Sequence, residues 1–220
     1  MFCRFADRAD AGRALADQLK QYAQRDDVVV LGLPRGGVPV AYEVARALGA
    51  PLDVLVVRKL GMPWQPELAM GAIASGDALY LDEELMRESG VSQEEFDRVL
   101  ADEKAQLARR EALFRDPRRA SVDVAGRVAI IVDDGLATGA SMKAAARALR
   151  ARGPAKLVAG LPVAPYDAAE RIVSDVDEFV CVASPELFFS VSQFYADFSE
   201  TTDDDVRAIL ARTSPASGHA

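Results

Sequence analysis

The sequence predicts an α/β protein built around a parallel sheet, on three observations. Residues 28–33, 128–132 and 156–163 form short, mainly apolar runs without polar alternation, as in strands that helices cover on both faces. Each run is followed by a segment whose apolar residues recur at helical spacing. Strands that alternate with helices in this way form right-handed βαβ units with parallel strands.

The first half of the chain contains one such unit and a hairpin. Gly49 follows an apolar-periodic segment and is a typical helix C-cap, and Ser75 to Asp77 have the composition of a turn. The expected elements, in chain order, are a helix at 8–22, a strand at 28–33, a helix ending at 48, a strand at 52–57, a loop at 59–67 and hairpin strands at 69–74 and 78–81.

The second half begins with a long polar helix at 92–115. Ser92 and Glu95 have the spacing of a capping box, and the apolar stripe is so narrow that the helix must lie on the surface or against a second subunit. The later elements are expected to be a strand at 128–132, a helix from Ser141, a strand at 156–163, a helix at 166–174, a strand at 178–182 and a helix beginning at Thr202.

Composition limits the class of protein. The chain has 220 residues, half of them apolar, which is enough for one substantial core. We expect one domain over 1–212, with an insertion at about 82–120, and a disordered tail at 213–220. The net charge of −8 argues against general affinity for nucleic acid.

The sequence also predicts the cellular setting. It contains no N-terminal apolar signal core and no apolar run of bilayer length, so we expect no membrane association. The two cysteines, Cys3 and Cys181, are too few for a disulfide scaffold and lack metal-ligand spacing, so we expect a reducing cytoplasm.

The segment VAIIVDDGLATGASMKAA is the most informative part of the chain. Asp133 and Asp134 follow an apolar strand, at the end where open α/β sheets bind ligands. The loop 135–141 contains glycines and leads into a helix, whose free amides and dipole suit a phosphate. An ordinary strand-to-helix turn with capping aspartates would explain each part alone, but it does not require them in this order.

This segment resembles the ribose-phosphate signature of the type I phosphoribosyltransferases. The resemblance implies a Rossmann-like parallel sheet with a helical insertion and a small C-terminal hood, and it implies binding of 5-phosphoribosyl-1-pyrophosphate (PRPP). Asp133 and Asp134 would hydrogen-bond the ribose hydroxyls. The residues that would line the 5-phosphate pocket are Ala137, Thr138, Gly139, Ala140 and Ser141. The segment has no Gly-Lys-Ser/Thr and so is not a Walker-type loop.

A second glycine-rich turn follows the first predicted strand. By the same resemblance, Arg35, Gly36 and Gly37 would bind pyrophosphate, and so would the basic pair Arg58 and Lys59. Considered alone, the turn could be an ordinary glycine-containing loop that binds no ligand. Arg58 and Lys59 could likewise be two solvated cations at the end of a strand.

The segment 59–72 stands where the family has its flexible catalytic loop. It carries one lysine, at its start, and Trp64, which we expect to be exposed. Closure could be weaker here, or arginines of the long helix could supply charge across a homodimer; these arginines could equally form a solvated face. They are Arg109, Arg110, Arg115, Arg118 and Arg119.

The segment 183–205 is aromatic and corresponds to the family's hood. Phe188 and Phe189 are the candidates for stacking on a nucleobase, although packing of a small subdomain explains the aromatic residues equally well. Ala137 stands where enzymes for hypoxanthine and guanine carry an aspartate, which argues against a 6-oxopurine acceptor.

The resemblance extends over almost the whole chain and is to a bacterial PRPP-binding branch of the family. It implies transfer of the 5-phosphoribosyl group from PRPP to a nitrogenous base, with Asp133, Asp134, Lys59 and Arg35 as catalytic residues. Mg²⁺ would be the cofactor, held mainly by PRPP and water with no direct protein ligand. A PRPP-binding regulatory protein without turnover is the alternative, and a sugar-phosphate hydrolase is a third option that lacks a visible nucleophile–base pair.

Overall fold

The computed structural model describes residues 5–114 and 121–213 and contains two sheets. The larger sheet has five parallel strands in the order β2-β1-β6-β7-β8. Its strands are β1 (Val28–Gly32), β2 (Leu52–Val54), β6 (Val128–Val132), β7 (Lys156–Val163) and β8 (Glu178–Ala183). The α/β class with a parallel sheet, as expected for a type I phosphoribosyltransferase fold, is therefore confirmed.

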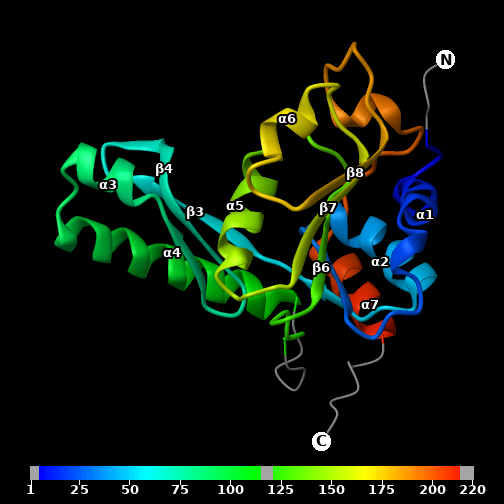
Figure 1. Ribbon diagram of the computed structural model, residues 1–220, viewed down its shortest axis with the longest axis horizontal. Coiled ribbons are helices and arrows are strands. Elements are labelled where there is room, and N and C mark those ends of the chain that lie inside the picture. The colour runs from blue at the N-terminus through cyan, green and yellow to red at the C-terminus, as the bar shows by residue number, and fades with distance from the viewer. Residues whose placement is uncertain (1–4, 115–120, 214–220) are drawn as a thin grey trace, which may run out of the picture.

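Helices cover both faces of this sheet (Figure 1). Helices α1, α2 and α7 pack on one face, and α5 and α6 pack on the other. Their bounds are α1 (Arg8–Gln18), α2 (Gly37–Leu48), α5 (Ala140–Arg150), α6 (Ala168–Ile172) and α7 (Asp203–Arg212).

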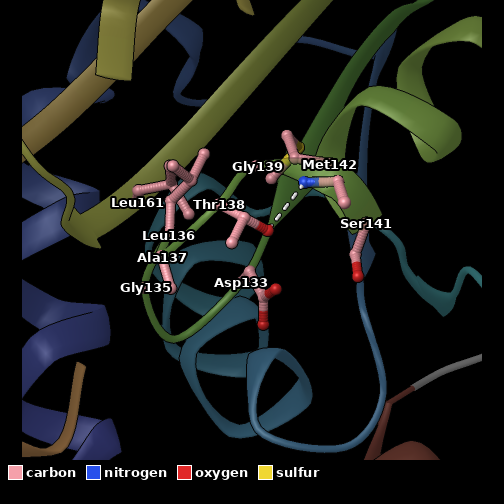
Figure 2. A pocket seen from close by; sticks show the side chains of 10 residues that line it. Asp133, Gly135, Leu136, Ala137, Thr138, Gly139, Ser141, Met142 and Leu161 are labelled. Carbon is pink, nitrogen blue, oxygen red and sulfur yellow. Dashed lines mark hydrogen bonds between the residues drawn. The ribbon is translucent and has the colours of Figure 1, made fainter. Parts of the chain in front are cut away.

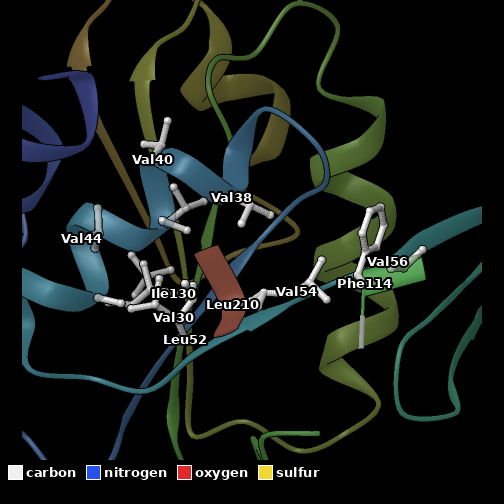
Figure 3. Close-up of a cluster of buried hydrophobic side chains, with 14 of the residues drawn as sticks. Val30, Val38, Val40, Val44, Leu52, Val54, Val56, Phe114, Ile130 and Leu210 are labelled. Carbon is white, nitrogen blue, oxygen red and sulfur yellow. The ribbon is translucent and has the colours of Figure 1, made fainter. Parts of the chain in front are cut away.

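Strands β1 and β6 lack polar residues because their alternate residues enter two different cores. Val30 and Ile130 pack with Val44 of α2 in the cluster that Figure 3 shows, whereas Val29 and Ile131 face α5. All five residues of β1 and all five of β6 are buried.

The smaller sheet is an antiparallel hairpin arm that extends from the body (Figure 1). Its strands are β3 (Val57–Met62), β4 (Gln65–Ala74) and β5 (Ala78–Leu81). The hairpin predicted at 69–74 and 78–81 is confirmed, with Ala74 paired to Ala78.

The loop predicted at 59–67 is wrong. Lys59 pairs with Ala72 and Met62 with Gln65, so most of that segment belongs to β3 and β4. Leu60 and Met62 are buried while Lys59 is exposed, which is the alternation of a strand with one covered face. Prolines and glycines hid this pattern. Strand β2 ends at Val54, whereas the sequence predicted it to run on to residue 57, because Leu55 and Val56 are also apolar and buried.

Helices α3 (Glu83–Ser89) and α4 (Gln93–Phe114) follow the arm. The capping box before α4 is confirmed, since the Ser92 amide donates to Glu95 Oε2 at 3.0 Å and the Glu95 amide donates to Ser92 Oγ at 3.3 Å. Phe96, Leu107 and Phe114 are the buried stripe, and α4 packs against β3 and β4 of its own chain.

The N-terminal end of the described chain meets residues 194–195 near the carboxyl ends of β7 and β8. The Phe5 amide donates to the Phe194 carbonyl at 2.8 Å, and Phe5, Phe194 and Tyr195 form a small apolar cluster. A 3₁₀ turn at Val191–Phe194 precedes α7, which begins after Thr202, as the sequence predicted. Thr202 and Asp205 form a capping box at that start. The predicted tail lies, but for Thr213, outside the described residues.

None of the helices within residues 5–114 and 121–213 combines the length and the apolar character that a membrane span requires.

Candidate functional site

The glycine-rich turn after β1 lies directly beside the acidic pair after β6. The two strands are parallel neighbours, with Gly32 in register with Val132. A side chain on Gly36 would place its Cβ 2.7 Å from the Asp134 carboxyl carbon, and one on Gly37 would place it 2.8 Å from Asp133 Cα. Glycine is therefore required at both positions for the turns to approach this closely.

The loop after β6 forms a cavity of about 150 Å³ (Figure 2). Gly139 is the N-cap residue of α5 and has a φ of +81°. Because glycine has no side chain, the N-cap residue accepts no side-chain hydrogen bond from the amides of the first helical turn. Figure 2 shows Asp133, Thr138 and Ser141 around this cavity, and the dashed line in it is the bond from the Ala140 amide to Thr138 Oγ1, at 3.4 Å. The residues that line the cavity are Asp133, Gly135, Leu136, Ala137, Thr138, Gly139, Ala140, Ser141, Met142 and Leu161.

The two aspartates are in different electrostatic settings. Burial, together with the charge of Asp134, raises the pKa of Asp133 well above its ordinary value. Burial also raises the pKa of Asp134, but there the Arg8 guanidinium acts in the opposite direction. The Asp133 carboxyl lines the cavity and is the less compensated of the two.

Arg8 connects the acidic pair to the C-terminal segment. Its Nε lies 2.8 Å from Asp134 Oδ2, its Nη1 donates to the Ser199 carbonyl at 2.7 Å, and its guanidinium lies 4.0 Å from the Phe198 ring centroid. The Tyr195 hydroxyl donates to the Asp134 carbonyl at 2.5 Å. These contacts fix the position of Asp134 from two distant parts of the chain.

The sequence did not indicate Arg8 or Tyr195. Arg8 was an ordinary polar residue at the start of an amphipathic helix, and Tyr195 was one of several aromatic residues. Each meets Asp134 only through tertiary packing, so no local pattern could have found them.

Comparison with known proteins supplies the family. The model of the phosphoribosyl transferase domain matches residues 5–199. The chain belongs to the phosphoribosyl transferase family. The resemblance predicted from the signature segment is thereby confirmed.

Similar members of the family are bacterial. Two Mycobacterium tuberculosis proteins, from strains CDC 1551 and H37Rv, carry the provisional name of phosphoribosyl transferase and are each 50% identical to the chain over 208 residues. The alignment covers 94% of this chain and 46% of theirs, so the chain spans about half the length of the curated relatives it matches. The crystal structure of TT1426 from Thermus thermophilus is 43% identical, with a TM-score of 0.87 over 96% of this chain and 99% of that one.

The structure does not bring the predicted cations into the cavity that the loop after β6 forms, which is called the signature cavity below. Arg35 Nη1 lies 3.9 Å from Asp203 Oδ1, and its Nη2 is paired with Glu200. None of Arg35, Arg58 and Lys59 is among the residues that line the signature cavity. The peptide bond between Pro34 and Arg35 is cis.

The basic pair on β3 points in two other directions. Arg58 donates to Glu103 and Gln106 of α4, each at 2.7 Å. Lys59 lies 3.5 Å from Glu67 and lines a separate, neighbouring cavity. These residues lie within strand β3 and not, as the sequence suggested, at the end of the strand before it.

The two predicted aromatic residues differ from each other. Phe188 stacks on Phe194 with ring centroids 5.4 Å apart, as expected for packing of a subdomain. The Phe189 side chain is 85% exposed, and neither ring lines the signature cavity.

The structure describes two of the five arginines that could supply charge missing from segment 59–72. Arg109 and Arg110 are exposed on α4, while Arg115, Arg118 and Arg119 lie outside the described residues. Trp64 is exposed, as predicted.

The sequence also did not indicate Arg171, which supports the loop from outside. Its Nη1 donates to the Ala137 carbonyl at 3.2 Å, and its Nη2 pairs with Asp167 at 2.6 Å. A cation that holds a loop carbonyl restricts the loop before any ligand binds. Asp167 and Arg171 are four positions apart, as in many helix ion pairs, and this spacing does not show that Arg171 reaches the Ala137 carbonyl.

Proposed function

We propose that this chain is a Mg²⁺-dependent phosphoribosyltransferase that moves the 5-phosphoribosyl group from PRPP to a nitrogenous base and releases pyrophosphate. The observation that carries the proposal is the contact of the Gly36–Gly37 turn with Asp133 and Asp134, at neighbouring ends of two parallel strands. Two anion-binding turns and an acidic pair at one sheet edge suit a sugar with a phosphate at each end.

At the end of β6, the acidic pair and the loop after it have different proposed roles. The carboxylates of Asp133 and Asp134 accept hydrogen bonds from the ribose hydroxyls. The amides of the loop and of the first turn of α5 bind the 5-phosphate, whose charge is favoured by the helix dipole. The residues proposed for that pocket are Ala137, Thr138, Gly139, Ala140 and Ser141.

Pyrophosphate is assigned to the turn after β1. Arg35, Gly36 and Gly37 lie beside the acidic pair, and Arg35 must leave Glu200 and Asp203 to reach the ligand. The Glu200 side chain is 72% exposed, so this pair is weakly held and the exchange costs little. Arg58 and Lys59 would reach the pyrophosphate only after a movement of the hairpin arm.

The chemistry needs no protein nucleophile. The bond between ribose C1 and the pyrophosphate oxygen breaks ahead of attack, which leaves an oxocarbenium-like sugar and a pyrophosphate of growing negative charge. A ring nitrogen of the base then forms the new bond to C1 with its lone pair. The protein contributes placement of both reactants and, through amides and Arg35, stabilises the charge on the leaving group.

The carboxylates also favour positive charge on the sugar. The less compensated of the two, Asp133, lines the cavity in which the ribose is proposed to lie, and its charge would stabilise the oxocarbenium-like carbon.

The acidic pair fits a Mg²⁺ ion held mostly by substrate. Within the described residues, no group of three or more His, Cys, Asp or Glu could hold a metal, and the cavity offers the Asp133 carboxylate as its charged oxygen donor. Mg²⁺ keeps several waters and binds through one or two carboxylates and substrate phosphates. When bound, it supplies positive charge to the diphosphate.

The acceptor, the assembly and the location are also part of the proposal. The acceptor is a small nitrogenous base. Ala137 carries no acid, which favours a base other than a 6-oxopurine, and the exposed ring of Phe189 is proposed to stack on that base.

A homodimer in the cytoplasm is proposed, and light scattering of the purified chain tests the dimer.

Calorimetric titration with PRPP and Mg²⁺, followed by a pyrophosphate-release screen over nitrogenous bases, tests the function. Saturable binding with release for at least one base supports it. Binding without release for any base would indicate a regulatory protein, and phosphate release from sugar phosphates without PRPP would indicate a hydrolase.

A further inference from the structure

A second cavity, of about 200 Å³, lies between the hairpin arm and helix α5. Strands β3, β4 and β5 form one side and α5 forms the other, and Figure 1 shows the arm running beside that helix. Ala140 is the one residue that also lines the signature cavity. The two cavities are therefore neighbours at the first turn of α5 but have otherwise different walls.

The walls of this second cavity are small and flat. Ala69, Gly71 and Ala72 of β4 face Ala144 of α5, so little side-chain volume fills the space between sheet and helix. The Tyr80 ring forms part of the lining and lies 5.2 Å from the Arg147 guanidinium. Such a space accommodates a planar ring by stacking and apolar contact.

The charges around the cavity are predominantly positive. Lys143 is half-buried and forms no ion pair with any residue of the described ranges. Lys59 lies 3.5 Å from Glu67, whose side chain is 92% exposed, so that pair is weak. Arg147 is held by Asp175 at 2.6 Å and is thereby fixed beside the ring of Tyr80.

We propose that this cavity binds a small aromatic carboxylate, with its ring between Tyr80 and the alanines and its carboxylate on the Lys143 ammonium. A half-buried lysine without a carboxylate partner is the group that such an anion would neutralise. The site goes beyond the proposed transfer reaction, because its walls, apart from Ala140, are separate from the signature cavity, and because Lys143, Ala144 and Tyr80 have no part in that reaction.

Titration of the protein with benzoate, followed by calorimetry and by amide chemical shifts, tests the site. The expected result is saturable binding that Lys143→Gln weakens roughly tenfold or more, since a charge-assisted contact is lost. Lys20→Gln is the matched control, because Lys20 is exposed, lies on another element and, within residues 5–114 and 121–213, pairs with Asp17 alone. Benzamide, which has the same shape without charge, should bind far more weakly than benzoate.

Two further measurements separate this site from the PRPP site. Ala144→Leu should fill the cavity and abolish benzoate binding, while its affinity for PRPP and its circular dichroism stay those of the parent. Asp133→Asn should retain benzoate binding. Absence of benzoate binding, unchanged affinity in Lys143→Gln, or displacement of benzoate by ribose 5-phosphate, which has no pyrophosphate to draw the arm, would overturn the inference. Failure of the parent to bind PRPP while it binds benzoate would refute the transferase and leave this site standing.

Discussion

Arg8 and Asp134 are 126 positions apart in the sequence and form a 2.8 Å ion pair whose side chains are only 12% and 15% exposed. The pair joins the first helix to the acidic end of strand β6. Arg8 also donates to the Ser199 carbonyl, so its guanidinium is held at two points. A fixed guanidinium in turn fixes the Asp134 carboxylate, which belongs to the proposed ribose site, from outside the signature segment.

Replacement of Arg8 by alanine should destabilise the fold by about 2 kcal/mol at pH 7, because it leaves a desolvated carboxylate without its partner. Without Arg8 the pKa of Asp134 rises further, so the loss should shrink as the pH falls and Asp134 is protonated. Denaturant unfolding at pH 7 and pH 5 measures both effects. Arg13→Ala is the control, since among the residues that the structure describes Arg13 pairs with Asp10 alone, and both side chains are largely exposed. An equal loss in the two variants would contradict the role assigned to Arg8.

Replacement of Gly36 by alanine should abolish PRPP binding, because the added Cβ would meet the Asp134 carboxyl group. Gly90→Ala is the matched control: Gly90 has a φ of +67° and no atom within 4 Å of an added Cβ. That variant should lose about 1 kcal/mol of stability from backbone strain and keep its PRPP affinity. Titration calorimetry distinguishes the two. Retained binding in Gly36→Ala would mean that the turn and the acidic pair do not act together.

Asp133→Asn should stabilise the protein at neutral pH while weakening PRPP binding. Burial raises the pKa of Asp133 in the folded state above its unfolded value, so the folded protein binds that proton more tightly and loses stability as the pH rises above about 4. Asparagine removes this loss and keeps an oxygen for the Asp134 amide, which donates to Asp133 Oδ1 at 2.9 Å. The gain should therefore be larger at pH 7 than at pH 4 in denaturant unfolding. A variant equally destabilised at both pH values would refute the electrostatic account.

Glu200→Gln should raise the affinity for pyrophosphate a few-fold, because it releases Arg35 from a competing carboxylate. The effect is small because the pair is exposed. Glu186→Gln, on the same segment and without a role in the site, is the control. If Glu200→Gln lowers pyrophosphate affinity, Glu200 assists binding and does not compete for Arg35.

The parts of the fold that depend on local chemistry could be predicted from the sequence. Unbroken apolar runs indicate the buried strands β1 and β6, and capping boxes indicate the starts of α4 and α7. The adjacency of the two glycine-rich turns follows from the parallel pairing of β1 with β6.

The parts of the fold and of the site that depend on contacts between distant residues could not be predicted from the sequence. The strands around Lys59 contain prolines and glycines, and their pairing becomes visible only once Leu60 and Met62 are seen to be buried. Arg8 and Tyr195 lie 126 and 61 positions from Asp134, and Arg35 lies 165 positions from Glu200, with which it pairs. Local spacing contains no record of such pairs.

The central claim is that two neighbouring turns hold opposite ends of one doubly phosphorylated sugar. The most direct test is calorimetric titration of Arg35→Ala and Ser141→Ala with PRPP, pyrophosphate and ribose 5-phosphate. Arg35→Ala should lose affinity for pyrophosphate and PRPP and keep it for ribose 5-phosphate, and Ser141→Ala should lose affinity for ribose 5-phosphate and PRPP and keep it for pyrophosphate. Equal losses for both fragments in either variant, or unchanged PRPP affinity in both, would contradict the claim.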